Sequence, residues 1–174
     1  MNLLATIIGL LAVALFVFSY QLKRRRPLIF CNAASRVLYV TQYLLLGAFD
    51  GALLDITAFF ISLLCGEREK GFVKKHFWVL FTLSNVAILG VGILTYKNVF
   101  SLFAIFGVFF EVLALWLKKE TYIRLVSLVA APCWLVYNLL SGAYGSVVGN
   151  VIAIVSILVA ILRHDIKKRS ARNG

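Results

Sequence analysis

The chain has 174 residues, of which 62% are hydrophobic and only 14% are charged. A soluble domain is about half apolar and about a quarter charged, so this composition predicts a multi-pass membrane protein without a separate soluble domain. The formal net charge of +11 would suggest nucleic-acid binding in a soluble protein, but the long apolar runs exclude nucleic acid as a partner and predict a lipid bilayer instead.

Seven apolar segments follow one another along the chain, each near the length that crosses about 30 Å of hydrocarbon. A spanning helix satisfies its own backbone hydrogen bonds, so we expect an all-α membrane protein with seven transmembrane helices. The first segment has no basic stretch before it and no clear cleavage site after it, which favours a retained helix over a signal peptide. The segments are Leu3–Leu22, Leu28–Phe49, Gly51–Cys65, Phe77–Tyr96, Val99–Leu117, Leu125–Leu140 and Gly145–Leu162.

Basic residues are concentrated in every second loop of this arrangement. Sixteen lysines and arginines lie in residues 23–26, 68–75, 118–124 and 163–172, whereas Lys97 lies in a loop on the other side. Because positive loops stay in the cytoplasm, this pattern predicts an N-terminus outside and a C-terminus in the cytoplasm. The basic loops are topology signals in this interpretation, and anionic-lipid binding is the alternative.

Two stretches resemble each other at a constant offset of 95 residues, Val37–Asp55 and Pro132–Asn150. Both carry Leu-Leu, a glycine and an alanine in the same places, and Asp55 falls at the position of Asn150. Sequence similarity at a constant offset indicates an internal duplication. It predicts a 3+1+3 protein with parallel three-helix-bundle repeats: residues 1–66, a cytoplasmic loop and linker helix at 67–96, residues 97–163, and a basic cytoplasmic tail at 164–174.

Polar and aromatic residues form stripes on the second and sixth segments, and such stripes must face protein or water inside a bilayer. At about 1.5 Å per residue they form two levels. An outer ring is the candidate substrate site, and its members are Tyr39, Gln42, Asp55, Trp134, Tyr137, Asn138 and Asn150. An inner pair, Arg36 with Glu111, is either a gate or a structural ion pair.

Some of these residues also have purely structural interpretations. Tyr144 and Trp134 are candidate interfacial anchors, of which Trp134 fits less well because it lies deeper. Asn138 and Asn150 could hold neighbouring helices together. Asp55 has no obvious partner in the sequence, so it is the candidate for binding a cation or a proton. The free thiols Cys31, Cys65 and Cys133 are expected to be buried, and neither their spacing nor the two histidines predict a metal site.

The pattern of Trp134, Tyr137 and Asn150 resembles the SWEET, SemiSWEET and PQ-loop transporters, whose repeat is a three-helix bundle. Tyr39, Gln42 and Asp55 occupy these places in the first half, which departs from the pattern, and no proline-glutamine pair is present. The whole chain resembles the YgjV family of the bacterial inner membrane. The resemblance implies a transporter-like fold, and Asp55 at the place of a sugar-binding asparagine argues against assuming a sugar.

Three functions remain open from the sequence. The favoured one is a transporter of a small polar solute that works by alternating access, without a cofactor. A non-transporting partner or sensor on the same scaffold is the alternative. An intramembrane enzyme is less favoured because the sequence has no nucleophile–base set. Self-association into a homo-oligomer stays open.

Overall fold

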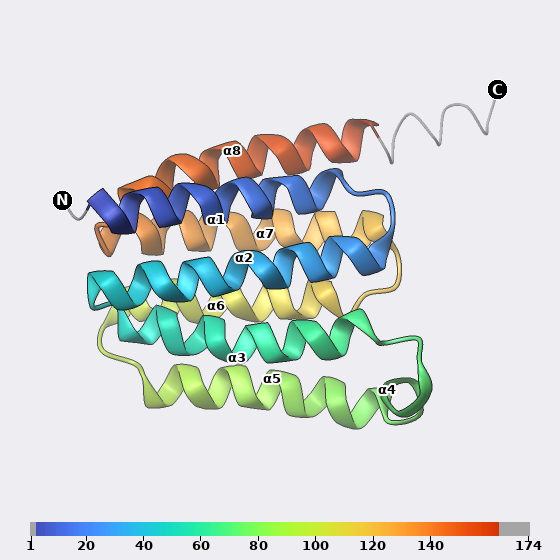
Figure 1. The fold of residues 1–174 in the computed structure, drawn as a ribbon. Helices are drawn as coiled ribbons and strands as arrows, with labels where there is room; N and C mark the ends of the chain where they lie inside the picture. The colour runs from blue at the N-terminus through green and yellow to red at the C-terminus, as the bar shows by residue number, and fades with distance from the viewer. Residues whose placement is uncertain (1–2, 164–174) are drawn as a thin grey trace.

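The computed structural model describes residues 3–163, and all regular structure in this range is helical. The all-α prediction is therefore confirmed, while the predicted tail at 164–174 lies outside the described residues. Seven long helices lie side by side, and a five-residue helix occupies one loop (Figure 1). In chain order they are α1 (Leu3–Gln21), α2 (Arg25–Leu46), α3 (Phe49–Gly66), α4 (Gly71–Lys75), α5 (Phe77–Leu94), α6 (Val99–Leu115), α7 (Glu120–Leu140) and α8 (Tyr144–Ile161).

Five of the described helices, α1, α3, α5, α7 and α8, are long and apolar enough to cross a membrane. The 17-residue α6 is also apolar but shorter. α2 has 22 residues, but it is the least apolar of the long helices because it carries buried polar side chains such as Asn32, Arg36 and Gln42. Length and composition alone therefore support five spans.

The helix boundaries differ from the predicted ones where polar residues interrupt the apolar pattern. α2 begins at Arg25 and not Leu28, and α7 begins at Glu120 and not Leu125, because their first turns are charged. α2 ends at Leu46, before the predicted Phe49, because Gly47 adopts the left-handed conformation with φ of 70°. Such a glycine ends a helix without the steric cost of a Cβ atom.

The turns after α2 and α7 are built in the same way. Gly142 has φ of 72°, so it adopts the same left-handed conformation as Gly47. Ala48 N–H donates to the Tyr43 carbonyl at 2.9 Å, and Ala143 N–H donates to the Asn138 carbonyl at 2.9 Å. These bonds satisfy carbonyls at the helix ends and set the following helix antiparallel to the one before.

Helices α2 and α7 each pack between two neighbours, which defines two groups, α1–α3 and α6–α8. α2 packs against α1 and α3, and α7 packs against α6 and α8. The two groups meet where α1 contacts α8 and where α3 contacts α6, and α5 packs outside against α3 and α6. Several side chains of α5 are largely exposed, including Trp78 and Leu94. The polar faces of α2 and α7 are thereby directed toward the space between the two groups.

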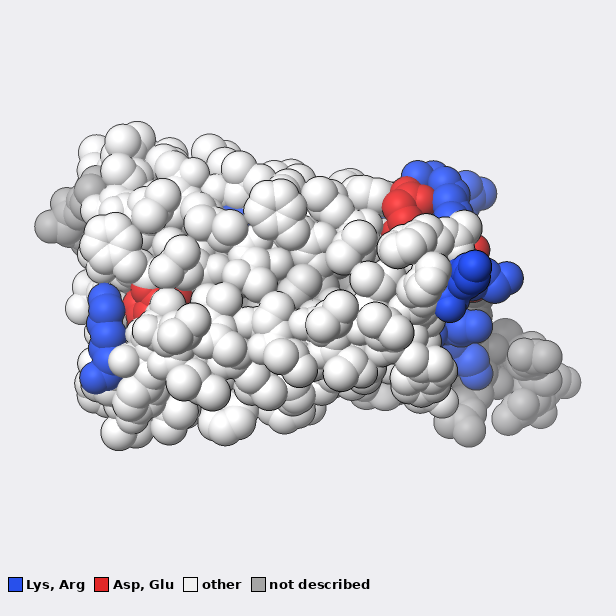
Figure 2. Space-filling model, turned by 90° about the horizontal axis from the view of Figure 1, so that it is seen from below, with Lys and Arg blue, Asp and Glu red and all other residues white. Residues whose placement is uncertain are grey.

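Charged side chains on the face in Figure 2 lie at the two ends of the bundle, and most lysines and arginines lie at one of them. Between the ends this face is almost free of charge. An apolar band between two polar ends is the surface that a bilayer requires. The surface thus agrees with the composition in indicating a protein embedded in a membrane.

Candidate functional site

A cavity of about 30 Å³ lies between the two helix groups, with lining residues from α1, α2, α3, α6, α7 and α8. A cavity of this volume has room for one or two water molecules. Seven of the nine predicted site residues line it, and they are Arg36, Tyr39, Asp55, Glu111, Trp134, Asn138 and Asn150. The structure therefore brings most of the predicted residues together, although whether they bind a solute stays a prediction.

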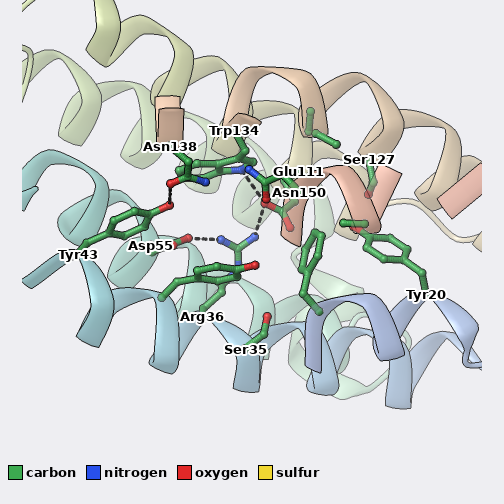
Figure 3. Close-up of a pocket in the computed structure, with 15 residues that line it drawn as sticks. Tyr20, Ser35, Arg36, Tyr43, Asp55, Glu111, Ser127, Trp134, Asn138 and Asn150 are labelled. Carbon is green, nitrogen blue, oxygen red and sulfur yellow. Dashed lines mark hydrogen bonds and ion pairs between the residues drawn. The ribbon is translucent and has the colours of Figure 1, made fainter. Parts of the chain in front are cut away.

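Arg36 of α2 holds two carboxylates from two other helices (Figure 3). Its Nη1 lies 2.5 Å from Asp55 Oδ1 on α3, and its Nη2 lies 3.0 Å from Glu111 Oε2 on α6. All three side chains are at most 5% exposed. The expectation that Asp55 lacks a partner is wrong, because the long Arg36 side chain spans the distance between the two predicted levels. The outer ring and the inner pair form one charged cluster.

Glu111 is the better satisfied of the two carboxylates. Besides Arg36, it accepts hydrogen bonds from Asn32 Nδ2 at 3.2 Å and from Trp134 Nε1 at 3.0 Å. Arg36 is the only hydrogen-bond donor that Asp55 has among the described residues. The indole of Trp134 is thus fixed by a buried carboxylate, which sequence reasoning did not anticipate.

Three aromatic rings form one wall of the cavity. Tyr43 stacks with Tyr39 on one side and with Trp134 on the other, each with ring centroids 6.3 Å apart. The hydroxyl of Tyr43 donates to Asn138 Oδ1 at 2.8 Å, which joins α2 to α7 (Figure 3). Tyr43 was not among the predicted site residues, but its spacing of four from Tyr39 places both on one helix face.

Gln42 and Tyr137 do not line the cavity. Gln42 Oε1 accepts a hydrogen bond from Ser146 Oγ at 2.6 Å, which joins α2 to α8. The Tyr137 hydroxyl donates to Asp50 Oδ1 at 2.9 Å and accepts from Gly51 N–H at 3.1 Å, which joins α7 to α3. Both predicted residues connect the two helix groups instead of facing the central space.

Asn150 carries an unsatisfied polar group into the cavity. Its side chain lies in the lining and the residue is 6% exposed, yet its Nδ2 has no hydrogen-bond partner among the described residues. Buried polar atoms in proteins are nearly always paired, so an unpaired one at a cavity indicates a water molecule or a bound ligand as its partner. Within residues 3–163 no group of three or more metal-ligating side chains occurs.

The cysteines differ in part from the prediction. All three are free, and only Cys65 is fully buried, whereas Cys31 and Cys133 are half-buried. None lines the cavity. They are not part of the candidate site.

Arginines close the basic end of the bundle. Arg25 donates to the Leu115 and Leu117 carbonyls at 2.7 and 2.9 Å, at the end of α6. Arg124 donates to the Tyr20 and Leu22 carbonyls at 3.4 and 3.2 Å, at the end of α1. Cations at helix C-termini satisfy free carbonyls and oppose the helix dipole. Two residues predicted as topology signals therefore also bind one helix group to the other.

Comparison with known protein families identifies a family for this chain. A family described as bacterial inner membrane proteins, Imp-YgjV, matches residues 3–168, nearly the whole chain. No curated protein and no solved structure matches the chain significantly. The family match agrees with the five apolar helices and with the nearly charge-free band between the two ends of the bundle. The chain belongs to the YgjV family of bacterial inner membrane proteins.

Proposed function

We propose that the protein is a transporter that moves a small polar solute across the inner membrane by alternating access. In this proposal seven helices span the bilayer, α1–α3 and α6–α8 are parallel repeats, and α5 is the linker. The basic end, which includes the α1–α2 and α6–α7 loops, faces the cytoplasm, because positive loops are retained there. The N-terminus then lies outside.

The repeat is supported by bonds that occur in equivalent pairs. Positions 42 and 137 are 95 apart, as are positions 51 and 146. The hydrogen bond between Gln42 and Ser146 and the hydrogen bond between Tyr137 and Gly51 therefore join equivalent positions of the two repeats, although one is between side chains and the other uses the Gly51 backbone N–H. Tyr43 and Asn138, also 95 apart, bind each other. Paired contacts of this kind are expected around a twofold axis along the membrane normal.

The buried charged cluster is the observation that carries the transport proposal. Ionisable groups inside a membrane are costly and usually mark substrate or ion pathways. Here Arg36, Asp55 and Glu111 surround a cavity at the interface of the two helix groups, where transporters with repeats place their sites. The aromatic wall beside them offers flat surfaces, and Asn138 and Asn150 offer amides to a polar solute.

In this proposal the structure represents an occluded state, in which the central cavity is too small to hold the solute. The cavity of about 30 Å³ is far smaller than the roughly 300–1,000 Å³ of pockets that bind small molecules. Transport then requires the helix groups to separate at one end at a time. At the basic end this means breaking the hydrogen bonds of Arg25 and Arg124 to carbonyls of the other group.

The small cavity is also the observation that favours the alternative, a non-transporting membrane partner or sensor. Flux into proteoliposomes separates the two functions. We suggest a panel of monosaccharides, amino acids and small organic acids on solid-supported membranes, with Trp134→Ala as the cavity variant and Trp78→Ala on the exposed face of α5 as the matched control. Transport predicts a signal for at least one class that Trp134→Ala loses and Trp78→Ala keeps. No signal for any class would favour the alternative.

A further inference from the structure

The charged cluster of the cavity contains one more negative group than positive groups. Arg36 is its single cation, and it faces two carboxylates. The other buried charged side chains among residues 3–163 are Asp50 and Arg124, and both are bound elsewhere. An unbalanced charge surrounded by apolar helices is expensive. A further cation is therefore expected to accompany the cluster.

Asp55 is the carboxylate with capacity for that cation. An ionised carboxylate has about four lone-pair positions. Glu111 is ion-paired with Arg36 and also accepts hydrogen bonds from Asn32 and Trp134, whereas Asp55 has Arg36 alone among the described residues. The added positive charge is thus more favourably placed on Asp55 than on Glu111.

The amide of Asn150 is a second, independent sign of a bound group. It belongs to α8, whereas Asp55 belongs to α3, and both side chains line the cavity. With no acceptor for its Nδ2, this amide can turn its oxygen toward a cation, because its terminal torsion is broad. A space of about 30 Å³ accommodates one small ion with a water molecule but no larger solute.

We propose that Asp55 holds an exchangeable monovalent cation, a proton or a sodium ion, in this cavity. Its use as the coupling ion rests on the proposed transport function, while the site itself does not. Cation uptake neutralises Asp55 and leaves Arg36 paired with Glu111, so the cluster becomes neutral. Arg36 Nη1 is then held less strongly by Asp55 and becomes available to donate to a polar solute, which links cation binding to solute binding.

The titratable and charged groups that face Asp55 show which side chain would carry an exchanged proton. From the helices packed against it they are Arg36, Tyr39 and Tyr43 of α2 and Glu111 of α6. α5 contributes no titratable side chain. Arginine and tyrosine keep their charge states near neutral pH, so a proton taken up here must reside on a carboxyl group.

Infrared difference spectroscopy of the full chain in lipid nanodiscs tests the site without any solute. On a change from alkaline to mildly acidic pH, a proton site predicts a new carboxylic acid C=O band. On replacing choline chloride by sodium chloride at alkaline pH, a sodium site predicts a shift of the carboxylate bands. Either signal should be lost in Asp55→Asn and kept in Asp50→Asn, the other buried aspartate.

Labelling the aspartate side-chain carboxyls with carbon-13 in the unsubstituted chain adds a readout that does not depend on a variant folding. The responding band should move with the label, which excludes Glu111. The proposal is overturned if neither titration gives a signal, if Asp55→Asn keeps it, or if the label leaves the band in place. Because no solute is used, a failed flux assay would not affect this result, and a failed titration would not decide transport.

Discussion

Replacing Arg36 by glutamine tests how the cavity cluster contributes to stability. The substitution leaves two buried carboxylates without their shared cation, and both side chains are at most 5% exposed. Removing one partner of a buried ion pair typically costs about 3–5 kcal/mol. For a chain of this size about 1 kcal/mol corresponds to about 2–4 °C in Tm, so we expect Tm to fall by roughly 6–20 °C.

Thermal unfolding followed by tryptophan fluorescence in one detergent gives this number, and Arg26→Gln is the matched control. Arg26 also forms an ion pair, with Glu67, but its side chain is 57% exposed, and exposed pairs contribute about 0–1 kcal/mol. The triple variant Arg36→Gln, Asp55→Asn, Glu111→Gln removes all three charges and should regain most of the lost stability. The reasoning is refuted if Arg36→Gln is no worse than Arg26→Gln, or if the triple variant is as unstable as the single one.

Two further predictions concern the packing between the helix groups and the surface charges. A Cβ atom on Gly149 of α8 would lie 2.0 Å from Val13 Cγ2 of α1, so Gly149→Ala should lower the free energy of unfolding by about 1–3 kcal/mol. Gly90→Ala is the control, because a Cβ atom there meets open space. Equal Tm values for the two variants would contradict the close contact of Gly149 with Val13. Hydrogen bonds from Arg26 and Lys70 lower the pKa of Glu67 below its ordinary value of 4.5. The ionised Glu67 side chain therefore stabilises the folded chain above pH 4.5, and this stabilisation is lost as the pH falls through the lowered pKa. The Tm difference between the unsubstituted chain and Glu67→Gln should therefore be present at neutral pH and vanish in acid, and a difference independent of pH would contradict the assignment.

The apolar pattern predicted the positions of the long helices well, because most of them carry an apolar run of nearly their full length. It misplaced the first turns of α2 and α7, where Arg25 and Glu120 begin the helices. Charged first turns carry no hydropathy signal, although they belong to the helix. The five-residue α4 was missed for the same reason, since it lies within a basic loop.

The candidate site was predicted by residue type and in one pairing, Arg36 with Glu111, but its other pairings were not predicted. Helix periodicity places Tyr39 and Tyr43 on one face, yet it does not reveal that Tyr43 binds Asn138 across the interface. Estimating depth from residue counts separated Arg36 from Asp55, because such counts ignore the length of an arginine side chain. Partners on different helices depend on tertiary packing, which a single sequence does not display.

Alternating access itself is tested most directly by distances at the two ends of the bundle. Spin labels at Phe49 and Tyr144, exposed and 95 positions apart, report on one end, and labels at Lys23 and Lys118, also exposed and 95 apart, report on the basic end. Double electron–electron resonance in nanodiscs should give two populations for each pair. Acid or sodium should shift them so that one end widens as the other narrows. A single distance at each end, unchanged by pH, sodium and solute, would contradict the account.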